Sequence, residues 1–272
     1  MVEVCCPVCG EALAQEPGRW YCGRGHSFDV ARQGYVNLLP VSQKHSRQPG
    51  DTREQVAARK AFLDGGTYAP VAEALTRFAA AERPGAMLDI GCGEGYYLTQ
   101  VQAALPELEA WGVDISKDAV RYAAVRNKRA RFLTATASHL PFADRQFDVV
   151  SSMFALTLPE EFRRVLRPGG AFIQVTAGED HLLALRSLIY ETVRRKQPEP
   201  DPVLPGFTLE RSELVEFSFD LEDSAAVMAL LAMTPHYLRI TKEGLARARA
   251  AEGLQDRAQA RFRIYRRTED VL

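Results

Sequence analysis

From residue 86 onward, short apolar runs alternate with stretches of helical periodicity. Length and β-branched or aromatic content predict strands at 86–90, 109–115, 130–134, 147–154 and 171–178. One of the intervening segments, 160–170, is expected to be a helix that Pro168 and two glycines end. Strands and helices in such alternation predict an α/β domain built on a doubly wound, mostly parallel sheet.

Further elements are expected on either side of this alternating region. Asp51 or Thr52 can cap a helix that runs to about Leu63 and ends at two glycines. Two last strands are predicted at 215–221 and 260–267, with a helix between them.

The pattern also divides the chain into parts. A long helix is expected through Tyr190 and Arg195, followed by a proline-rich, lid-like loop. We expect a small module over 1–38, a linker and helix over 39–80, and the catalytic domain over 81–272.

The sequence AMLDIGCGEGYYL, residues 86–98, carries a glycine-rich turn directly after the first predicted strand. Gly91, Gly93 and Gly95 let the backbone approach a ligand there, and Asp114 can accept hydrogen bonds from both hydroxyls of a ribose. Glu94 within the turn would repel a pyrophosphate but attract an ammonium or sulfonium group. The pattern therefore favours S-adenosylmethionine over a dinucleotide as the cofactor.

Composition and charge narrow the class of protein. The chain has 272 residues, 46% of them hydrophobic, enough for a sizeable core and a small appended module. No apolar run approaches the roughly 20 residues that cross a bilayer, so we expect a cytoplasmic protein with no membrane partner. The formal net charge of −1 gives no overall attraction to RNA, which must then be bound by local basic patches.

Three of the five cysteines lie within the opening MVEVCCPVCG. In a reducing compartment, clustered cysteines indicate metal ligation more than disulfides. Cys6 and Cys9 form a CxxC pair, and twelve residues later Cys22 and His26 form a CxxxH pair, a spacing that suits tetrahedral Zn²⁺. Four protein ligands leave no open position, which predicts a structural zinc ribbon or knuckle. Cys5 is expected to be spare, since its use would stretch the first pair to CxxxC.

Basic residues in the linker are candidates for contacts with RNA phosphates, namely Lys44, Arg47, Arg59 and Lys60. The competing interpretation of this charge run is a solvated linker surface, and the sequence leaves both open.

Two motifs of the main domain, LPFADRQFDVV and RVLRPGGAFI, resemble the late motifs of class I S-adenosylmethionine-dependent methyltransferases. Together with CPVCG, the CxxxH pair, GHSFDVARQGYVNLLP, SRQPGD and ARKAFLDGGTY, the chain resembles the bacterial RlmA family of 23S rRNA guanine-N1 methyltransferases along nearly its whole length. This resemblance implies S-adenosylmethionine, zinc, a 23S rRNA hairpin as partner, and a homodimer. Carried over by position, it places cofactor contacts at Tyr68, Gly93, Glu94 and His181.

The stretch after the fourth predicted strand bears on the reaction. It reads SMFALTLP, unlike the NPPY-type motif of amino methyltransferases, and Cys92 in the glycine turn is the only cysteine available to a C5 mechanism. Relatives often carry a Pro-Cys pair where this chain has Leu156-Thr157, so the choice of target guanine is open.

A base must take the proton of guanine N1, and no residue stands out. Glu160, Glu179 and Asp180 are nearby acids, and water is an alternative. Two competing functions remain: methylation of another RNA base or a small molecule, and RNA binding without turnover.

Overall fold

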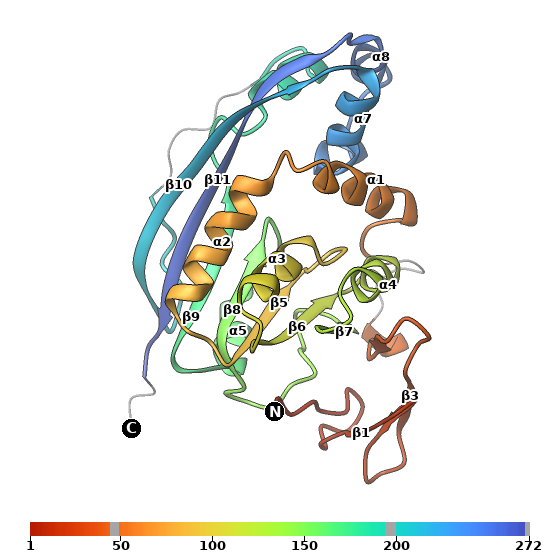
Figure 1. Ribbon diagram of the computed structural model, residues 1–272, viewed down its shortest axis with the longest axis vertical. Helices are drawn as coiled ribbons and strands as arrows, with labels where there is room; N and C mark the ends of the chain where they lie inside the picture. Colours follow the sequence, from red (N-terminus) through yellow and green to blue (C-terminus); the bar gives the residue numbers. More distant parts are fainter. Residues whose placement is uncertain (44–48, 194–199, 270–272) are drawn as a thin grey trace.

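A single eight-stranded sheet forms the centre of the protein (Figure 1), a computed structural model that describes residues 1–43, 49–193 and 200–269. The strand order is β10-β11-β9-β8-β5-β6-β7-β4. Strands β4 to β9 run parallel, whereas β11 pairs antiparallel with β9 and β10. The predicted doubly wound α/β fold is confirmed. The strands are β4 (Val36–Asn37), β5 (Ala86–Ile90), β6 (Glu109–Asp114), β7 (Arg131–Thr134), β8 (Phe147–Met153), β9 (Leu166–Ala177), β10 (Phe207–Leu221) and β11 (Leu254–Arg267).

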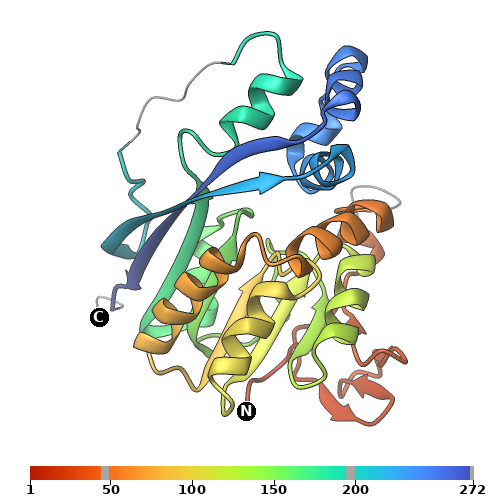
Figure 2. The same cartoon turned by 45° about the horizontal axis from the view of Figure 1, so that its top comes forward.

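Three helices cover one face of this sheet (Figure 2): α2 (Ala69–Ala81), α3 (Tyr96–Ala104) and α4 (Lys117–Arg126). Their apolar residues recur at helical spacing, for example Val71, Leu75 and Phe78 in α2, and they pack into one buried cluster with β5, β9 and β11. Helix α5 (Pro159–Val165) packs on the opposite face through Phe162 and Val165.

The N-terminal module covers the rest of that opposite face. It is a three-stranded antiparallel sheet of β1 (Ala14–Glu16), β2 (Arg19–Tyr21) and β3 (Ser27–Asp29). Trp20 of the module meets the fully buried Trp111 of β6 at 6.4 Å between ring centroids, and Trp111 in turn meets Phe142 at 5.4 Å. The module and the central sheet therefore share one apolar core, and β4 extends the sheet by pairing Val36 with Leu133 of β7.

Helical elements gather over the carboxyl ends of the parallel strands (Figure 1). They are α1 (Arg53–Asp64), α6 (Leu183–Ile189), α7 (Ser224–Ala232), the 3₁₀ helix η2 (Pro235–Leu238) and α8 (Lys242–Ala250), while a second 3₁₀ helix, η1 (Val41–Gln43), follows β4. Helix α1 packs against α7. As predicted, α1 begins after Thr52, which forms a capping box with Gln55, and it ends at Gly65.

Two predicted helices are shorter than expected. The helix of 160–170 ends at Val165, because Leu166 already pairs with Phe147 and the residues up to Gly170 bulge out of β9 before Ala171 pairs with Val149. The prediction of a long helix through Tyr190 and Arg195 was wrong. Helix α6 stops at Ile189, where the guanidinium of Arg247 donates to the last carbonyls, and Arg195 lies outside the described residues.

Candidate functional site

The glycine-rich turn between β5 and α3 lies at the carboxyl edge of the sheet. Gly91, Gly93 and Gly95 all have positive φ, at 70°, 55° and 80°. A Cβ at Gly91 would lie 2.7 Å from the Cβ of Ala155, so this turn and the segment after β8 touch. The three predicted glycines therefore fold into one turn at the edge where ligands bind in this fold, and the amides of Gly91 and Cys92 fix the turn by donating to the carbonyl of Val113.

Asp114 at the end of β6 is tied to this turn. Its Oδ2 accepts from the amide of Gly93 at 2.9 Å and its Oδ1 from the amide of Ser116 at 2.8 Å. Burial raises the pKa of Asp114, and these amide hydrogen bonds oppose the rise. Each carboxylate oxygen keeps a second acceptor position, which is what a ribose diol requires.

Glu94 is buried and belongs to a chain of ion pairs that links the turn to two helices. Arg126 of α4 lies 3.3 Å from the Glu94 carboxylate and 2.8 Å from that of Asp64 in α1, and Asp64 also pairs with Lys60. Burial raises the pKa of Glu94, while Arg126 works in the opposite direction. The carboxylate is thus held in place at the turn by a rigid partner.

The start of α1 closes over the same turn. The Asp51 carbonyl accepts from the hydroxyl of Ser116 at 2.8 Å, and the Asp51 carboxylate pairs with Arg59 at 2.5 Å. The Arg59 guanidinium lies 3.6 Å from where a Cβ on Gly93 would stand. This end of the predicted linker, with Arg59, therefore covers the cofactor side of the sheet.

Tyr68 and His181 come from distant parts of the chain and meet at this edge, with 6.4 Å between ring centroids. Tyr68 is 2% exposed, and its hydroxyl has no hydrogen-bond partner in the described part of the chain. The Nδ1 atom of His181 accepts from the amide of Gln259 at 3.0 Å, which leaves the proton of the neutral ring on Nε2. Burial lowers the pKa of His181 to about 4, so the ring is a neutral donor at physiological pH.

Sequence reasoning missed Asp89, a fully buried acid in the centre of the sheet. Its Oδ1 accepts from the hydroxyl of Ser151 at 2.7 Å, and its Oδ2 has no partner among the described residues. Burial raises the pKa of Asp89 to about 7. A polar residue inside the apolar strand AMLDI was the available signal.

The orphaned atoms of Tyr68 and Asp89, the buried Glu94 carboxylate and the acceptor Asp114 together fit S-adenosylmethionine. The cofactor carries an ammonium and a sulfonium for the acids, and a ribose for Asp114. A dinucleotide pyrophosphate would instead meet three carboxylates. Cys92 is buried with a strongly raised pKa, unlike a nucleophile.

Exposed apolar side chains border this site on the segment after β8. Phe154 has a positive φ of 53°, is 39% exposed, and lies 5.8 Å from His181 between ring centroids. Leu156 is 62% exposed, and its carbonyl accepts from the hydroxyl of Ser152 at 3.1 Å. A bulky residue with positive φ is uncommon and marks functional segments. The Leu156-Thr157 pair lies in this segment.

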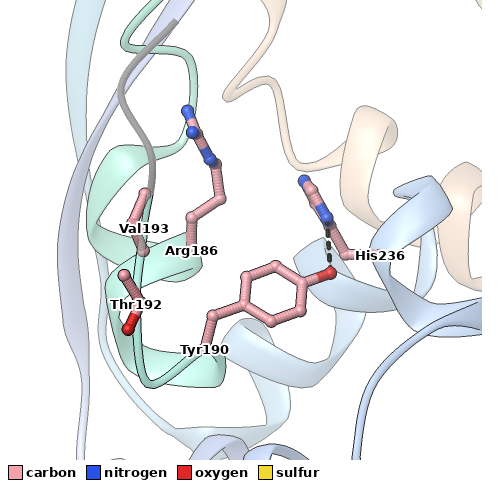
Figure 3. Close-up of a pocket in the computed structure, with 5 residues that line it drawn as sticks. All are labelled: Arg186, Tyr190, Thr192, Val193 and His236. Carbon is pink, nitrogen blue, oxygen red and sulfur yellow. Dashed lines mark hydrogen bonds between the residues drawn. The ribbon is translucent and has the colours of Figure 1, made fainter.

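An open pocket (Figure 3) is lined by Arg186, Tyr190, Thr192, Val193 and His236. The hydroxyl of Tyr190 and the Nδ1 of His236 are 2.9 Å apart. Both Arg186 and His236 contribute to the lowered pKa of His181, though less than burial does. The pocket therefore lies close enough to His181 for two of its side chains to act on that ring.

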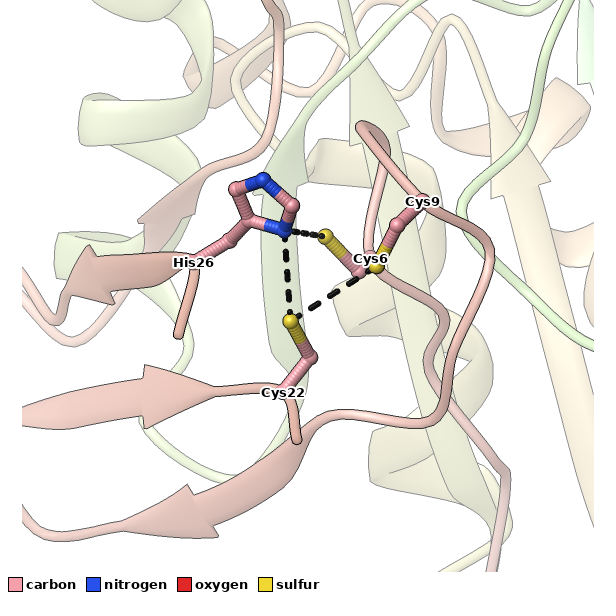
Figure 4. A group of neighbouring side chains, drawn as sticks. All are labelled: Cys6, Cys9, Cys22 and His26. Atoms are coloured by element: carbon pink, nitrogen blue, oxygen red, sulfur yellow. Dashed lines mark hydrogen bonds between the residues drawn. The ribbon is translucent and has the colours of Figure 1, made fainter. Parts of the chain in front are cut away.

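The cysteine-histidine cluster lies in the N-terminal module (Figure 4). Cys6 and Cys9 come from one loop, and Cys22 and His26 flank the turn between β2 and β3. The Nδ1 of His26 lies 3.6 Å and 3.3 Å from the sulfurs of Cys6 and Cys22, and the sulfurs of Cys9 and Cys22 are 3.6 Å apart. Ligands around a tetrahedral zinc stand about 3.8 Å apart for two sulfurs and about 3.5 Å for sulfur and nitrogen. The cluster fits zinc, and Cys5 lies outside it.

Of the four predicted RNA-binding residues, the structure describes Arg59 and Lys60. Lys44 and Arg47 lie outside the described residues. Arg59 faces the glycine turn, and Lys60 forms its ion pair with Asp64 on the exposed side of α1. Their contact with RNA stays a prediction.

The fold and the site define a class I methyltransferase of the S-adenosylmethionine-dependent type that carries an N-terminal zinc ribbon. The family description "RlmA, N-terminal" matches residues 4–47, and "Methyltransferase domain" matches residues 87–170. The chain belongs to the RlmA family of 23S rRNA guanine-N1 methyltransferases.

Two relatives support this membership. The 23S rRNA (guanine(748)-N(1))-methyltransferase of Streptomyces fradiae is 42% identical over 66% of this chain, which spans 65% of that enzyme's length. A Bacillus subtilis protein assigned as a 23S rRNA (guanine-N(1)-)-methyltransferase is 31% identical over 85% of both chains.

Among solved structures, one from the complex between the Haloferax volcanii Trm112 methyltransferase activator and a protein assigned as a methyltransferase matches with a TM-score of 0.50. The match has 17% identity and covers 82% of this chain and all of that one. It supports the fold alone. None of the described helices is both long and apolar enough to cross a membrane.

Proposed function

We propose that this protein transfers a methyl group from S-adenosylmethionine to N1 of a guanine in a hairpin loop of 23S rRNA. The observation that carries the proposal is the buried Glu94 in the glycine turn, together with the contact between Tyr68 and His181, in a chain that has the zinc ribbon of its family. The name of the Streptomyces fradiae relative makes guanine 748 the first position to examine.

We assign each residue near the turn to a different part of the cofactor. Asp114 accepts from the ribose, and Asp89 and Glu94 supply negative charge for the ammonium and sulfonium groups. Arg59 over Gly93 and the Nε2–H of His181 are donors for the carboxylate, and the ring of Tyr68 lies beside them. When bound, S-adenosylmethionine supplies an electrophilic methyl group.

On the acceptor side the chain mainly positions the base. A guanine in a duplex is inaccessible, so it must be unpaired or flipped, and the exposed ring of Phe154 gives it a face to stack on. Holding N1 in line with the methyl group supplies a large part of the rate. The position of Phe154 beside His181 supports this assignment.

We assign no protein base for the N1 proton. Glu179 accepts from its own amide and pairs with Arg261 at 3.5 Å, both of which lower its pKa, so it is a weak base. Glu160 is exposed on α5, and Asp180 lies in the turn before α6.

The zinc ribbon is assigned to RNA recognition, with structural zinc on Cys6, Cys9, Cys22 and His26. A homodimer, which the family resemblance implies, stays a prediction.

Primer extension tests the proposal. A methyl on guanine N1 blocks Watson–Crick pairing and stops reverse transcriptase, so unmodified 23S rRNA incubated with the protein and S-adenosylmethionine should give one new stop, one nucleotide before the modified guanine. The Asp114→Ala variant should give none. Absence of a stop with S-adenosylmethionine binding intact would point to another acceptor atom or a small-molecule substrate.

A further inference from the structure

The charge of the chain is distributed unevenly, with a strong excess of cations on α4 and the turn after it. Residues 117–131, KDAVRYAAVRNKRAR, hold six Lys or Arg and one acid, in a protein of formal net charge −1. The cations of this run are interleaved with apolar residues that α4 turns toward the sheet.

Two of these six cations are engaged inside the protein. Arg126 pairs with Glu94 and Asp64, and Arg131 donates to Gln15 of β1 at 2.7 Å while its guanidinium lies over Trp111. The other four form a solvent-facing surface, which we name the α4 stripe: Lys117, Arg121, Lys128 and Arg129.

The α4 stripe has the composition of a nucleic-acid contact. Arg121 lies over the ring of Tyr122, and Val125 between the charges is 58% exposed. Two acids lie near these cations. Asp118 is 3.8 Å from Arg121, at the limit of an ion pair. The exposed Glu107 follows Pro106, whose carbonyl accepts from Arg129. Exposed cations beside an aromatic ring suit phosphates and bases.

The position of the stripe joins the two functional parts of the molecule. Its first residue follows Ser116, whose amide binds Asp114 at the cofactor edge. Its other end reaches the N-terminal module, since Lys128 donates to the carbonyl of Gln33 at 2.9 Å, beside the exposed Arg32. Ten helical residues span about 15 Å. In both views α4 and the zinc ribbon lie toward the same end of the sheet, the end at β7 and β4 (Figures 1 and 2).

We propose that the α4 stripe, continued by Arg32, is the surface that binds the phosphate backbone of the RNA stem. This inference rests on the proposed function. A stem that runs along α4 from the zinc ribbon toward the end at Lys117 delivers its loop to the cofactor edge. Recognition there is of backbone charge, and the sequence of the stem is not read by these four side chains.

Binding of a plain 20-base-pair RNA duplex, with no loop guanine, isolates this surface from the methyl transfer. The full-length protein is compared with Lys117→Gln/Arg121→Gln, with Lys128→Gln/Arg129→Gln, and with the two pairs combined. Arg211→Gln/Arg257→Gln is the matched control, because both arginines are exposed on β10 and β11 at the opposite edge of the sheet and pair with single glutamates.

The combined variant should bind the duplex at least tenfold more weakly at 0.15 M salt. Its slope of log affinity against log salt should flatten by about 3, since each lost phosphate contact removes about 0.7–0.9. Each pair should give roughly half of this change, and the control pair none. S-adenosylmethionine affinity and the unfolding temperature should stay unchanged in every variant.

An unchanged duplex affinity in the folded, combined variant would overturn the inference and make this face an ordinary solvated surface or a contact for a protein. The inference would also be overturned if the combined variant lost no more duplex affinity than the Arg211→Gln/Arg257→Gln control. Because the duplex carries no acceptor, the result stands apart from the proposed function. A wild type that binds duplex through the stripe but gives no primer-extension stop would refute the reaction and leave the surface intact.

Discussion

The ring of Tyr68 stands edge-on to the imidazole of His181, with 6.4 Å between centroids and an interplanar angle of 85°. The Tyr68 hydroxyl is buried and unpartnered among the described residues, so Tyr68→Phe should stabilise the cofactor-free protein by about 1 kcal/mol. The same change should weaken S-adenosylmethionine binding severalfold. Thermal unfolding with and without the cofactor separates the two effects, and a variant that loses stability in both conditions would contradict the assignment.

Asp89 predicts a pH dependence of stability. Burial raises its pKa to about 7, so between about pH 4 and 7 the native state holds a proton that the unfolded chain has lost, and this carboxyl makes stability fall as pH rises. Asp89→Asn removes that fall. The stability of the variant relative to the wild type should therefore rise between pH 4 and pH 7, by about 4 kcal/mol in total at pH 8.

The measurement for Asp89 is the difference in unfolding free energy between variant and wild type at pH 5 and pH 8, without cofactor. The depressed pKa of His181 is common to both proteins and cancels in the difference. S-adenosylmethionine should bind the variant more weakly at pH 8, since a cationic ligand favours the ionised acid. A constant difference across the pH range would show that Asp89 does not titrate there.

Arg59 and Lys60 are neighbours on α1 that provide a matched pair. Arg59 faces the glycine turn directly, whereas Lys60 reaches Glu94 only through Asp64 and Arg126. Arg59→Gln should therefore weaken S-adenosylmethionine binding about tenfold, and Lys60→Gln should weaken it much less. Calorimetry with the cofactor gives both numbers. If both variants changed S-adenosylmethionine affinity equally little and both lost RNA affinity, Arg59 would be assigned to RNA binding and not to the cofactor.

Phe154 should act on the acceptor and not on the cofactor. Removing one stacking face costs about 1–3 kcal/mol, so Phe154→Ala should lower kcat/KM for the RNA by roughly 5- to 150-fold. Phe154→Tyr keeps the ring and should retain most activity. Unaltered turnover in the alanine variant would remove Phe154 from the acceptor site.

Loss of zinc should destabilise the entire protein. The ribbon shares a core with the catalytic sheet through Trp20 and Trp111, so Cys9→Ser should lower the temperature of the main unfolding transition by several degrees, not add a separate early one. Cys5→Ser is the control, since Cys5 lies outside the cluster. An unchanged main transition with lost metal would mean that the ribbon folds independently.

The sequence predicted the parts of the fold whose signals are local. The glycine turn, the capped helix α1 and the CxxC and CxxxH pairs each depend on residues close in the chain, and the structure forms all of them. The end of α6 could not be predicted in this way, because Arg247, which caps its carbonyls, lies far along the chain.

The cofactor site shows the same division. Tyr68 and His181 were expected there from the family resemblance alone, whereas the structure shows them in contact. The position of Arg59 depends on how Asp51 seats on Ser116, a contact between segments that no periodicity encodes. Asp89 was visible as an acid in an apolar strand, but its missing partner is a property of packing.

The ribbon's place on the sheet limits how this enzyme can be dissected or recombined. Trp111, Phe142 and Phe147 are buried, and residues 2–38 belong to the apolar cluster that covers them. A catalytic fragment that began after residue 43 would expose the aromatic side chains on this face of the sheet to solvent, and it would aggregate. An RNA-reading module from another enzyme could be grafted here only if it brought a matching apolar wall, so the ribbon and the sheet are constrained to evolve together.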